Sequence, residues 1–295
     1  MRYLIINADD FGVCRATNQA IEEAFEGGAL SSATLMTPCD SAKDALARAK
    51  ANPKIRMGLH ITTTSEWARK WGPILGAENA RSLVDENGFF YSSSEAFAAQ
   101  AQGAELAAEI EAQYQCMLSE GFRPTHADSH MGSVYGIGGP SFMKETLEFC
   151  ARHDLPFRFP RRLEGVKEIF RMASVPPALE AAHAQAVAYA DALGVKLIDN
   201  ISTCSVGFAA LTSYETLKNA YREAISRLPE GVSEIFMHPS LGNSPIAEDN
   251  PRWQARVWEH RLLLDDELMR HIEKEGFSLT TYNEAPFSRA GQHSG

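Results

Sequence analysis

The hydrophobic and polar positions of this chain follow one another in short blocks that predict alternating strands and helices. The first apolar run predicts a buried strand, and the apolar side chains after it recur at helical spacing until Gly27 and Gly28 end the helix. The expected elements are strand 3–6, helix 15–26, strand 31–36, helix 41–51 and strand 55–62. This order predicts a parallel sheet with right-handed crossover connections.

The same rhythm returns after an irregular stretch at residues 63–94, which we expect to form a surface excursion at the rim of a site. Beyond it we expect helices at 95–120, 142–153, 177–193, 214–227 and 253–275, and strands at 125–129, 157–159, 195–199, 234–238 and 278–281. Eight candidate strands interleaved with helices predict one α/β domain over residues 1–287, a distorted TIM-type barrel. Residues 288–295 are expected to form a flexible tail.

Composition narrows the classes of partner. The 295 residues carry a net charge of -10, and the isoelectric point is near 5.4. Nucleic acids and anionic membranes require a basic surface, so a small neutral or cationic substrate fits better. The chain has no long apolar run and no basic leader, so we expect a cytoplasmic protein. The five cysteines are scattered and lack CxxC spacing, which argues against a disulfide framework or a zinc knuckle.

Carboxylate and imidazole side chains stand at the carboxyl ends of the predicted strands. They are Asp9, Asp10, His60, His126, Asp128, His130 and His238. A single aspartate there often caps the next helix, and a single histidine is often a hydrogen-bonded core residue. In a barrel, however, all these strand ends face one mouth, which favours a metal site built from histidine and aspartate. Two adjacent carboxylates also need a cation, donors or a shared proton when buried.

Four ordered motifs, NADDFG, GLH, PTHADSH and MHP, resemble those of the YdjC-like carbohydrate deacetylases, which are related in mechanism to the NodB-type polysaccharide deacetylases. The resemblance covers nearly the whole chain. It implies that Asp10, His60 and His130 bind a divalent metal ion, that Asp9 is the general base and that His238 is the general acid. It also implies a small N-acetylated carbohydrate as the substrate, and the acidic charge noted above predicts no nucleic-acid or membrane partner. The oligomeric state stays open, a homo-oligomer included.

The chain departs from the family pattern at two places. The family commonly continues DSHxH where this chain has DSHMG, which removes a histidine near the site. It often has a short HLNLT stretch where this chain has HITTTSEWARKWGP, which alters the rim. Both departures bear on which sugar binds more than on the type of reaction.

Amide hydrolysis requires the same set of roles. A metal ion polarises the carbonyl and lowers the pKa of its water, a carboxylate takes the proton from that water, and a second titratable group protonates the departing nitrogen. Asp9 and His238 fit the last two roles, and for Asp9 and Asp10 to face one ion the backbone must twist between them. Zinc and magnesium are both considered as the ion. One carboxylate and two imidazoles suit zinc, cobalt, nickel or iron better than magnesium.

Five further residues are weaker candidates for contacts with the substrate or with the metal ligands. His126 could orient a ligand, and Asp128 could hydrogen-bond a metal-bound imidazole, although ordinary strand polarity explains both equally well. Arg158 could reach substrate hydroxyls or orient Asp9, or belong to a solvated basic patch. Trp67 and Trp71 could stack on sugar rings, but their spacing also suits a packing face, which we favour slightly.

Two other functions fit parts of the pattern. A metal-dependent sugar isomerase or aldolase on the same barrel would usually need more carboxylates or a Schiff-base lysine, and no lysine stands at a predicted strand end. A catalytically silent sugar-binding module would not need the full set of acid, base and metal-ligand residues. A metal-dependent hydrolase that removes acetyl from an N-acetylated sugar is therefore the leading hypothesis.

Overall fold

The computed structural model describes residues 1–204, 206–244, 247, 250 and 253–287, so the expected tail at 288–295 lies outside the described residues. The strands are β1 (Arg2–Phe11), β2 (Ser32–Leu35), β3 (Met57–Ile61), β4 (Ala127–Ser129), β5 (Asn200–Ser202), β6 (Gly231–Met237) and β7 (Phe277–Leu279). The α-helices are α1 (Arg15–Gly27), α2 (Ala42–Ala51), α3 (Ser94–Gln100), α4 (Gly103–Ser119), α5 (Met143–His153), α6 (Glu164–Ile169), α7 (Pro177–Leu193), α8 (Tyr214–Arg227), α9 (Trp253–Leu263) and α10 (Asp266–Lys274). Short 3-10 helices are η1 (Ala77–Asn79), η2 (Arg81–Leu83), η3 (His130–Tyr135) and η4 (Phe208–Ala210).

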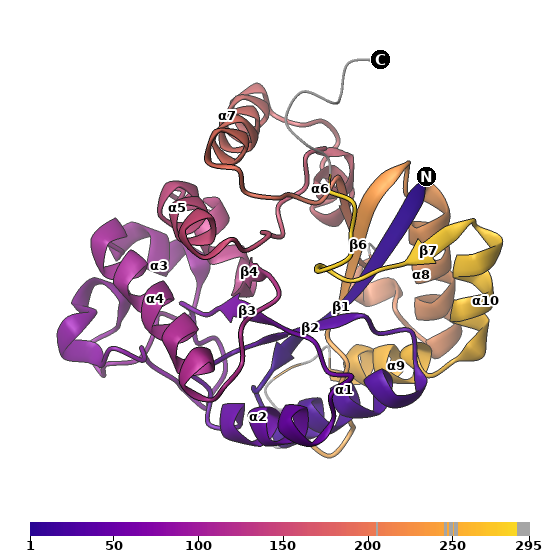
Figure 1. Cartoon of the computed structure of the whole chain (residues 1–295), viewed down its shortest axis with the longest axis horizontal. Coiled ribbons are helices and arrows are strands. Elements are labelled where there is room, and N and C mark those ends of the chain that lie inside the picture. Colours follow the sequence, from indigo (N-terminus) through magenta and orange to yellow (C-terminus); the bar gives the residue numbers. More distant parts are fainter. Residues whose placement is uncertain (205, 245–246, 248–249, 251–252, 288–295) are drawn as a thin grey trace.

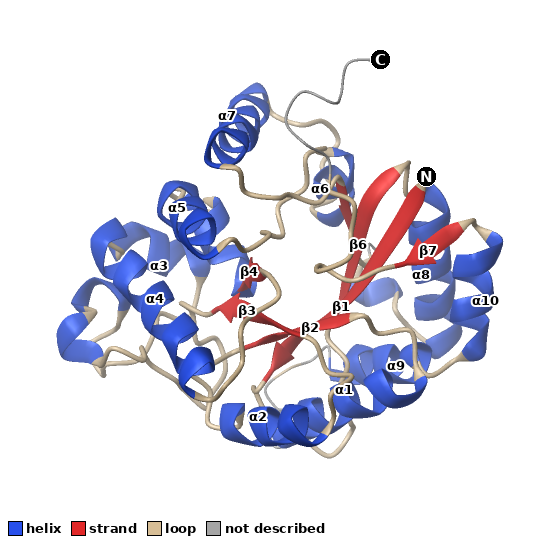
Figure 2. Cartoon of the chain, in the orientation of Figure 1, coloured by secondary structure: helices blue, strands red, loops and turns tan. Residues whose placement is uncertain are grey.

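Within the described residues, strand β1 is the centre of a seven-stranded parallel sheet. Six of its strands follow the order β4-β3-β2-β1-β6-β5, and β7 pairs with β1 outside this order. One edge of β1 pairs with β6, while the other edge pairs with β7 near its start and with β2 near its end. All residues of β1 from Leu4 onward are buried, as expected for a strand covered on both faces. The strands curl around a central region and the helices lie outside them (Figures 1 and 2).

Single bridges extend this sheet toward closure. Phe157 pairs with Ala127 of β4 on one side and with Leu197 on the other, and the chain then enters β5 next to β6. The result is a distorted (β/α) barrel, which confirms the predicted fold class. The expected strands at 157–159 and 195–199 are wrong in detail, because each is reduced to one bridging residue, Phe157 or Leu197, and the next ladder begins only at Asn200.

In two places where the sequence predicts one long helix, the structure has two shorter helices. The helix expected at 95–120 breaks between α3 and α4, where Ala101 and Gln102 are extended. The helix expected at 253–275 breaks before α10, because the Asp265 carboxylate accepts a hydrogen bond from the Glu267 amide and caps a new helix. Helix α6 was not expected.

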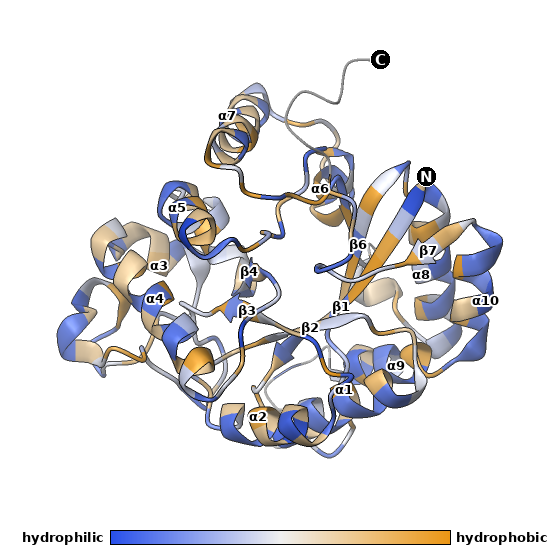
Figure 3. Ribbon diagram, viewed as in Figure 1, coloured by the Kyte–Doolittle hydropathy of each residue, from blue (hydrophilic) through white to orange (hydrophobic). Residues whose placement is uncertain are grey.

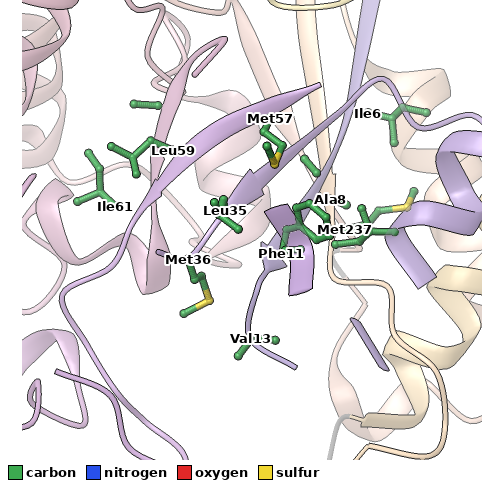
Figure 4. Close-up of a cluster of buried hydrophobic side chains, with 14 of the residues drawn as sticks. Ile6, Ala8, Phe11, Val13, Leu35, Met36, Met57, Leu59, Ile61 and Met237 are labelled. Atoms are coloured by element: carbon green, nitrogen blue, oxygen red, sulfur yellow. The ribbon is translucent and has the colours of Figure 1, made fainter. Parts of the chain in front are cut away.

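Apolar side chains from neighbouring strands form one buried cluster (Figure 4), to which buried helix residues also belong. Ile6, Ala8 and Phe11 of β1 lie in one cluster with Leu35 of β2 and Leu59 of β3. Hydrophilic colour dominates the outward helix faces (Figure 3). Helix α1, for example, buries Ala20, Ile21, Ala24 and Phe25 at helical spacing. No helix within the described ranges has the length and apolar character needed to cross a membrane.

The stretch at 63–94 is anchored in the core at its start. Trp67 and Trp71 are only 7% and 6% exposed, and their rings meet edge to face with centroids 5.7 Å apart. The Trp71 indole N–H donates to the Thr64 carbonyl over 2.8 Å. Both rings are therefore packed in the core, as the packing interpretation predicts, and a contact of either ring with substrate stays a prediction.

Candidate active site

The two aspartates stand where β1 leaves its regular course. The pairing of β1 with β2 shifts register between Ala8 and Phe11, and Asp10 has a φ of 65°. Aspartate tolerates this left-handed backbone better than most residues. The expected twist is therefore present, and it lets two successive side chains face the same centre. Asp9 is 3% exposed and Asp10 is 1% exposed.

Asp10, His60 and His130 converge on one point from three different segments of the chain. Asp10 Oδ1 lies 3.4 Å from His60 Nε2 and 3.3 Å from His130 Nδ1, and these two nitrogens are 3.3 Å apart. One ligand atom from each residue lies within 4.8 Å of the others. His60 comes from β3, and His130 begins η3 directly after β4, so the strand ends bring together the residues that the sequence singled out.

In both histidines, the ring nitrogen that does not face Asp10 contacts another carboxylate. His60 Nδ1 lies 2.5 Å from Asp128 Oδ1, and His130 Nε2 lies 3.0 and 3.1 Å from the two carboxylate oxygens of Glu66. Burial lowers the pKa of both imidazoles. The neighbouring carboxylates outweigh this effect and raise the pKa of His60 to about 10 and that of His130 to about 9. Such carboxylate–imidazole pairs fix the ring orientation of metal-binding histidines.

The Asp10 carboxylate is buried, yet no hydrogen bond from a described residue reaches either of its oxygens. Arg256 Nη1 of α9 lies 2.8 Å from Oδ2, at an angle that does not make a hydrogen bond. Although burial raises the pKa of Asp10, Arg256 and the two imidazoles hold it well below its usual range. A buried ionised carboxylate that accepts no hydrogen bond from a described residue and faces two imidazole nitrogens fits a divalent cation.

A second donor set, Asp9, His60 and Asp128, also lies within 4.8 Å. Its atoms are already engaged, because Asp128 accepts from the ring of His60 and Asp9 is held by Arg158. The set with Asp10 is therefore the better candidate for a metal centre.

Asp9 is held by a buried arginine. Arg158 Nη1 and Nη2 donate to Asp9 Oδ2 and Oδ1 over 2.7 and 2.6 Å, and Asn7 Nδ2 donates to Oδ1 over 2.9 Å. Burial alone would raise the pKa of Asp9, but the Arg158 guanidinium holds it well below its usual range. Of the roles considered for Arg158, only the orientation of Asp9 matches this geometry, and a solvated basic patch is wrong for a side chain 4% exposed.

Arg158 also neutralises the acids behind the site. Its Nη2 lies 2.8 Å from Asp128 Oδ2, and its Nε lies 2.5 Å from Glu234 Oε1. Glu234 accepts a hydrogen bond from the Tyr282 hydroxyl. Burial raises the pKa of Glu234 to about 7, against the opposing effect of Arg158.

His238 directly follows β6, and its side chain is about a third exposed. Its Nε2 lies 3.9 Å from Asp9 Oδ2, too far for a hydrogen bond. The His238 amide donates to Glu259 Oε2 of α9 over 2.7 Å, and Tyr221 donates to the other oxygen of Glu259. Helix α9 therefore contacts two parts of the site, Asp10 through Arg256 and His238 through Glu259.

His126 does not take the expected part. Its Nδ1 contacts the Thr125 hydroxyl at 2.9 Å, its Nε2 has no hydrogen-bond partner among the described residues, and its ring stacks on Tyr282 with centroids 3.6 Å apart. Burial holds its pKa well below the usual value, so the ring is neutral. No contact among the described residues joins His126 to a proposed metal ligand, so the geometry does not support its role in orienting one, and a contact with substrate stays a prediction.

Several contacts in the site were not predicted from the sequence. They come from Glu66, Arg256 and Glu259. Glu66 lies in the irregular stretch, and the other two lie on a helix, where charged residues ordinarily face solvent. The only available signal was the three-residue spacing of Arg256 and Glu259, which puts both on one face of α9.

Comparison with known proteins agrees with this arrangement. A family model described as YdjC-like protein matches residues 3–274. The chain belongs to the YdjC-like family. A carbohydrate deacetylase from Geobacillus stearothermophilus is 30% identical over 284 residues, which are 96% of this chain and 98% of that protein.

Two further relatives support the YdjC-like assignment. A chitooligosaccharide deacetylase from Yersinia enterocolitica is 37% identical over 163 residues, which are 54% of this chain and 60% of that protein. A crystal structure from Enterococcus faecalis V583, described as a "putative cellobiose-phosphate cleavage protein", has a TM-score of 0.75 and 28% identity, covering 95% of this chain and 97% of that one. The chain and the Enterococcus faecalis protein thus share their fold over nearly their whole lengths.

Proposed function

We propose that this YdjC-like protein is a metal-dependent hydrolase that removes acetyl groups from an N-acetylated sugar or oligosaccharide, with residues 1–287 as one catalytic domain. The observation that carries the proposal is the convergence of Asp10, His60 and His130, with Asp9 and His238 beside them. The relatives named as carbohydrate and chitooligosaccharide deacetylases support the class of substrate.

In this proposal Asp10 Oδ1, His60 Nε2 and His130 Nδ1 hold one divalent ion. When bound, the ion polarises the acetyl carbonyl and makes water a better nucleophile. Two imidazoles and one carboxylate form a donor set that suits zinc, cobalt, nickel or iron. Asp128 and Glu66 hold the imidazoles from behind, so that the lone pairs of the ligating nitrogens face the site.

Asp9 accepts the proton of the attacking water. Its Oδ1 already accepts hydrogen bonds from Asn7 and Arg158, whereas among the described residues Oδ2 accepts only one, from Arg158, so the proton is taken at Oδ2. Arg158 keeps Asp9 ionised at neutral pH and therefore ready to accept. His238 Nε2 gives a proton to the departing amine nitrogen, and its exposed ring can meet a substrate at the mouth. The products are acetate and the free amino sugar.

Acetate release from N-acetylated mono- and oligosaccharides tests the proposal. The protein is stripped with a chelator and then supplied separately with zinc, cobalt, nickel, iron or magnesium ions. We expect no release from the stripped protein and restored release with at least one ion, together with one free amine per acetate. Undiminished release from stripped protein would contradict the metal dependence. An intact N-acetyl group under every condition would contradict the deacetylase assignment.

A further inference from the structure

Glu66 stands on the far side of His130 from the other proposed ligands. Its carboxylate oxygens lie 3.0 and 3.1 Å from His130 Nε2, while Asp10 and His60 face Nδ1 of the same ring. The His130 side chain is 5% exposed and that of Glu66 is 16% exposed, so water competes little for this contact. Glu66 contacts the nitrogen that points away from the metal centre, so it is not itself placed as a ligand.

The position of Glu66 is fixed by its neighbours in sequence. Trp67, directly after it, is buried, and Trp71 donates its backbone amide to Ser65 Oγ over 3.1 Å. The Trp71 ring also lies edge-on to the His130 ring, with centroids 6.3 Å apart. The start of the 63–94 stretch is therefore packed against the core beside His130.

We propose that Glu66 is a positioning residue for His130. It accepts the Nε2–H of the ring, which fixes the tautomer and leaves the Nδ1 lone pair toward the metal centre. Asp128 holds His60 in the corresponding way from β4, through the opposite ring nitrogen. The inference rests on the metal site of the proposed function, and it assigns to this stretch a part in metal binding.

The test measures metal affinity, which does not depend on finding a substrate. The dissociation constant for zinc is measured by competition with a chromophoric chelator for the wild type, Glu66→Gln and Glu66→Ala. Loss of an outer carboxylate typically weakens metal binding by about 10- to 100-fold. We expect that loss for Glu66→Ala and a smaller loss for Glu66→Gln, because glutamine keeps an acceptor oxygen. Glu86, exposed and in the same stretch, provides the control: Glu86→Ala removes the same charge and should leave the constant unchanged.

The absorption spectrum of bound cobalt is the second readout, since a rotated His130 ring changes the ligand field. Unchanged zinc affinity and cobalt spectrum in Glu66→Ala would overturn the inference, even with a lowered melting temperature, because a purely structural role predicts that result. If Glu66→Ala fails to fold, the same comparison with Glu66→Gln decides. If zinc affinity falls in the expected order, most in Glu66→Ala and less in Glu66→Gln, but no sugar releases acetate, the inference is supported and the proposed reaction is contradicted. A wild type that binds no metal overturns both.

Discussion

Replacing Asp9 with Asn separates the proposed general base from the proposed metal ligands. Asparagine keeps the volume of the side chain but cannot take a proton from water. We expect acetate release to fall by about two to four orders of magnitude, the usual contribution of a positioned acid or base. At about 1.4 kcal/mol per tenfold, this corresponds to about 3–5 kcal/mol of barrier.

The same substitution should leave the protein folded. Asp9 is one of three carboxylates around Arg158, so Asp128 and Glu234 still neutralise the buried guanidinium in Asp9→Asn. The expected cost is therefore that of weakened hydrogen bonds to a charged group, about 1–3 kcal/mol of unfolding free energy, rather than that of an unpaired buried charge. Urea unfolding measures this quantity.

The assay follows acetate with saturating metal, and metal content is measured on the same sample. Metal should stay bound in Asp9→Asn, because Asp10, His60 and His130 are unchanged. Asp191→Asn is a matched control, since Asp191 also accepts two hydrogen bonds from one arginine, Arg161, and has no part in the site. Near-normal acetate release by Asp9→Asn would refute the role of the base, even if the metal site proved correct.

Four more outcomes are expected. His60→Ala or His130→Ala should lose stoichiometric metal in elemental analysis; full metal content in both variants would contradict the ligand set. His238→Ala should keep its metal but turn over slowly, because no imidazole remains there to protonate the departing nitrogen; near-normal turnover would exclude His238 as the acid. Trp71→Ala should cost about 3–5 kcal/mol in urea unfolding because the indole is buried, and a negligible loss would favour the rim interpretation. In metal-free protein the raised pKa values of about 10 and about 9 keep both ligand imidazoles protonated at neutral pH, so zinc affinity should rise with pH up to that range, and binding in weak buffer should release protons.

The sequence predicted the barrel and the metal cluster for a common reason. Parallel strands bring their carboxyl ends to one mouth, so polar residues after strands, such as Asp10, His60 and His130, can be grouped before any coordinates are known. His126 was grouped with these residues but contacts Thr125 and Tyr282 instead of a proposed metal ligand. The contacts of a side chain depend on how neighbouring elements pack, and the sequence of one strand does not contain that information.

The supporting contacts could not be predicted because they depend on how distant elements pack. Arg256 and Glu259 appear in the sequence as ordinary charges on a helix, and only the placement of α9 against β1 and β6 turns them toward Asp10 and His238. The contact of Glu66 could not be predicted either, because its stretch has no hydrophobic periodicity from which its course in the fold could be inferred. Phe157 and Leu197 close the sheet by single bridges, which leave too short a pattern for strand recognition.

The central claim is that Asp10, His60 and His130 hold one divalent ion at which an N-acetyl group is hydrolysed. Its most direct test is a titration of stripped protein with zinc or cobalt ion, in which acetate release from an N-acetylated oligosaccharide is measured at each addition. The account predicts that the rate rises in proportion to bound metal and stops rising at one ion per chain. A rate that is independent of metal, or one that saturates at another stoichiometry, would contradict it.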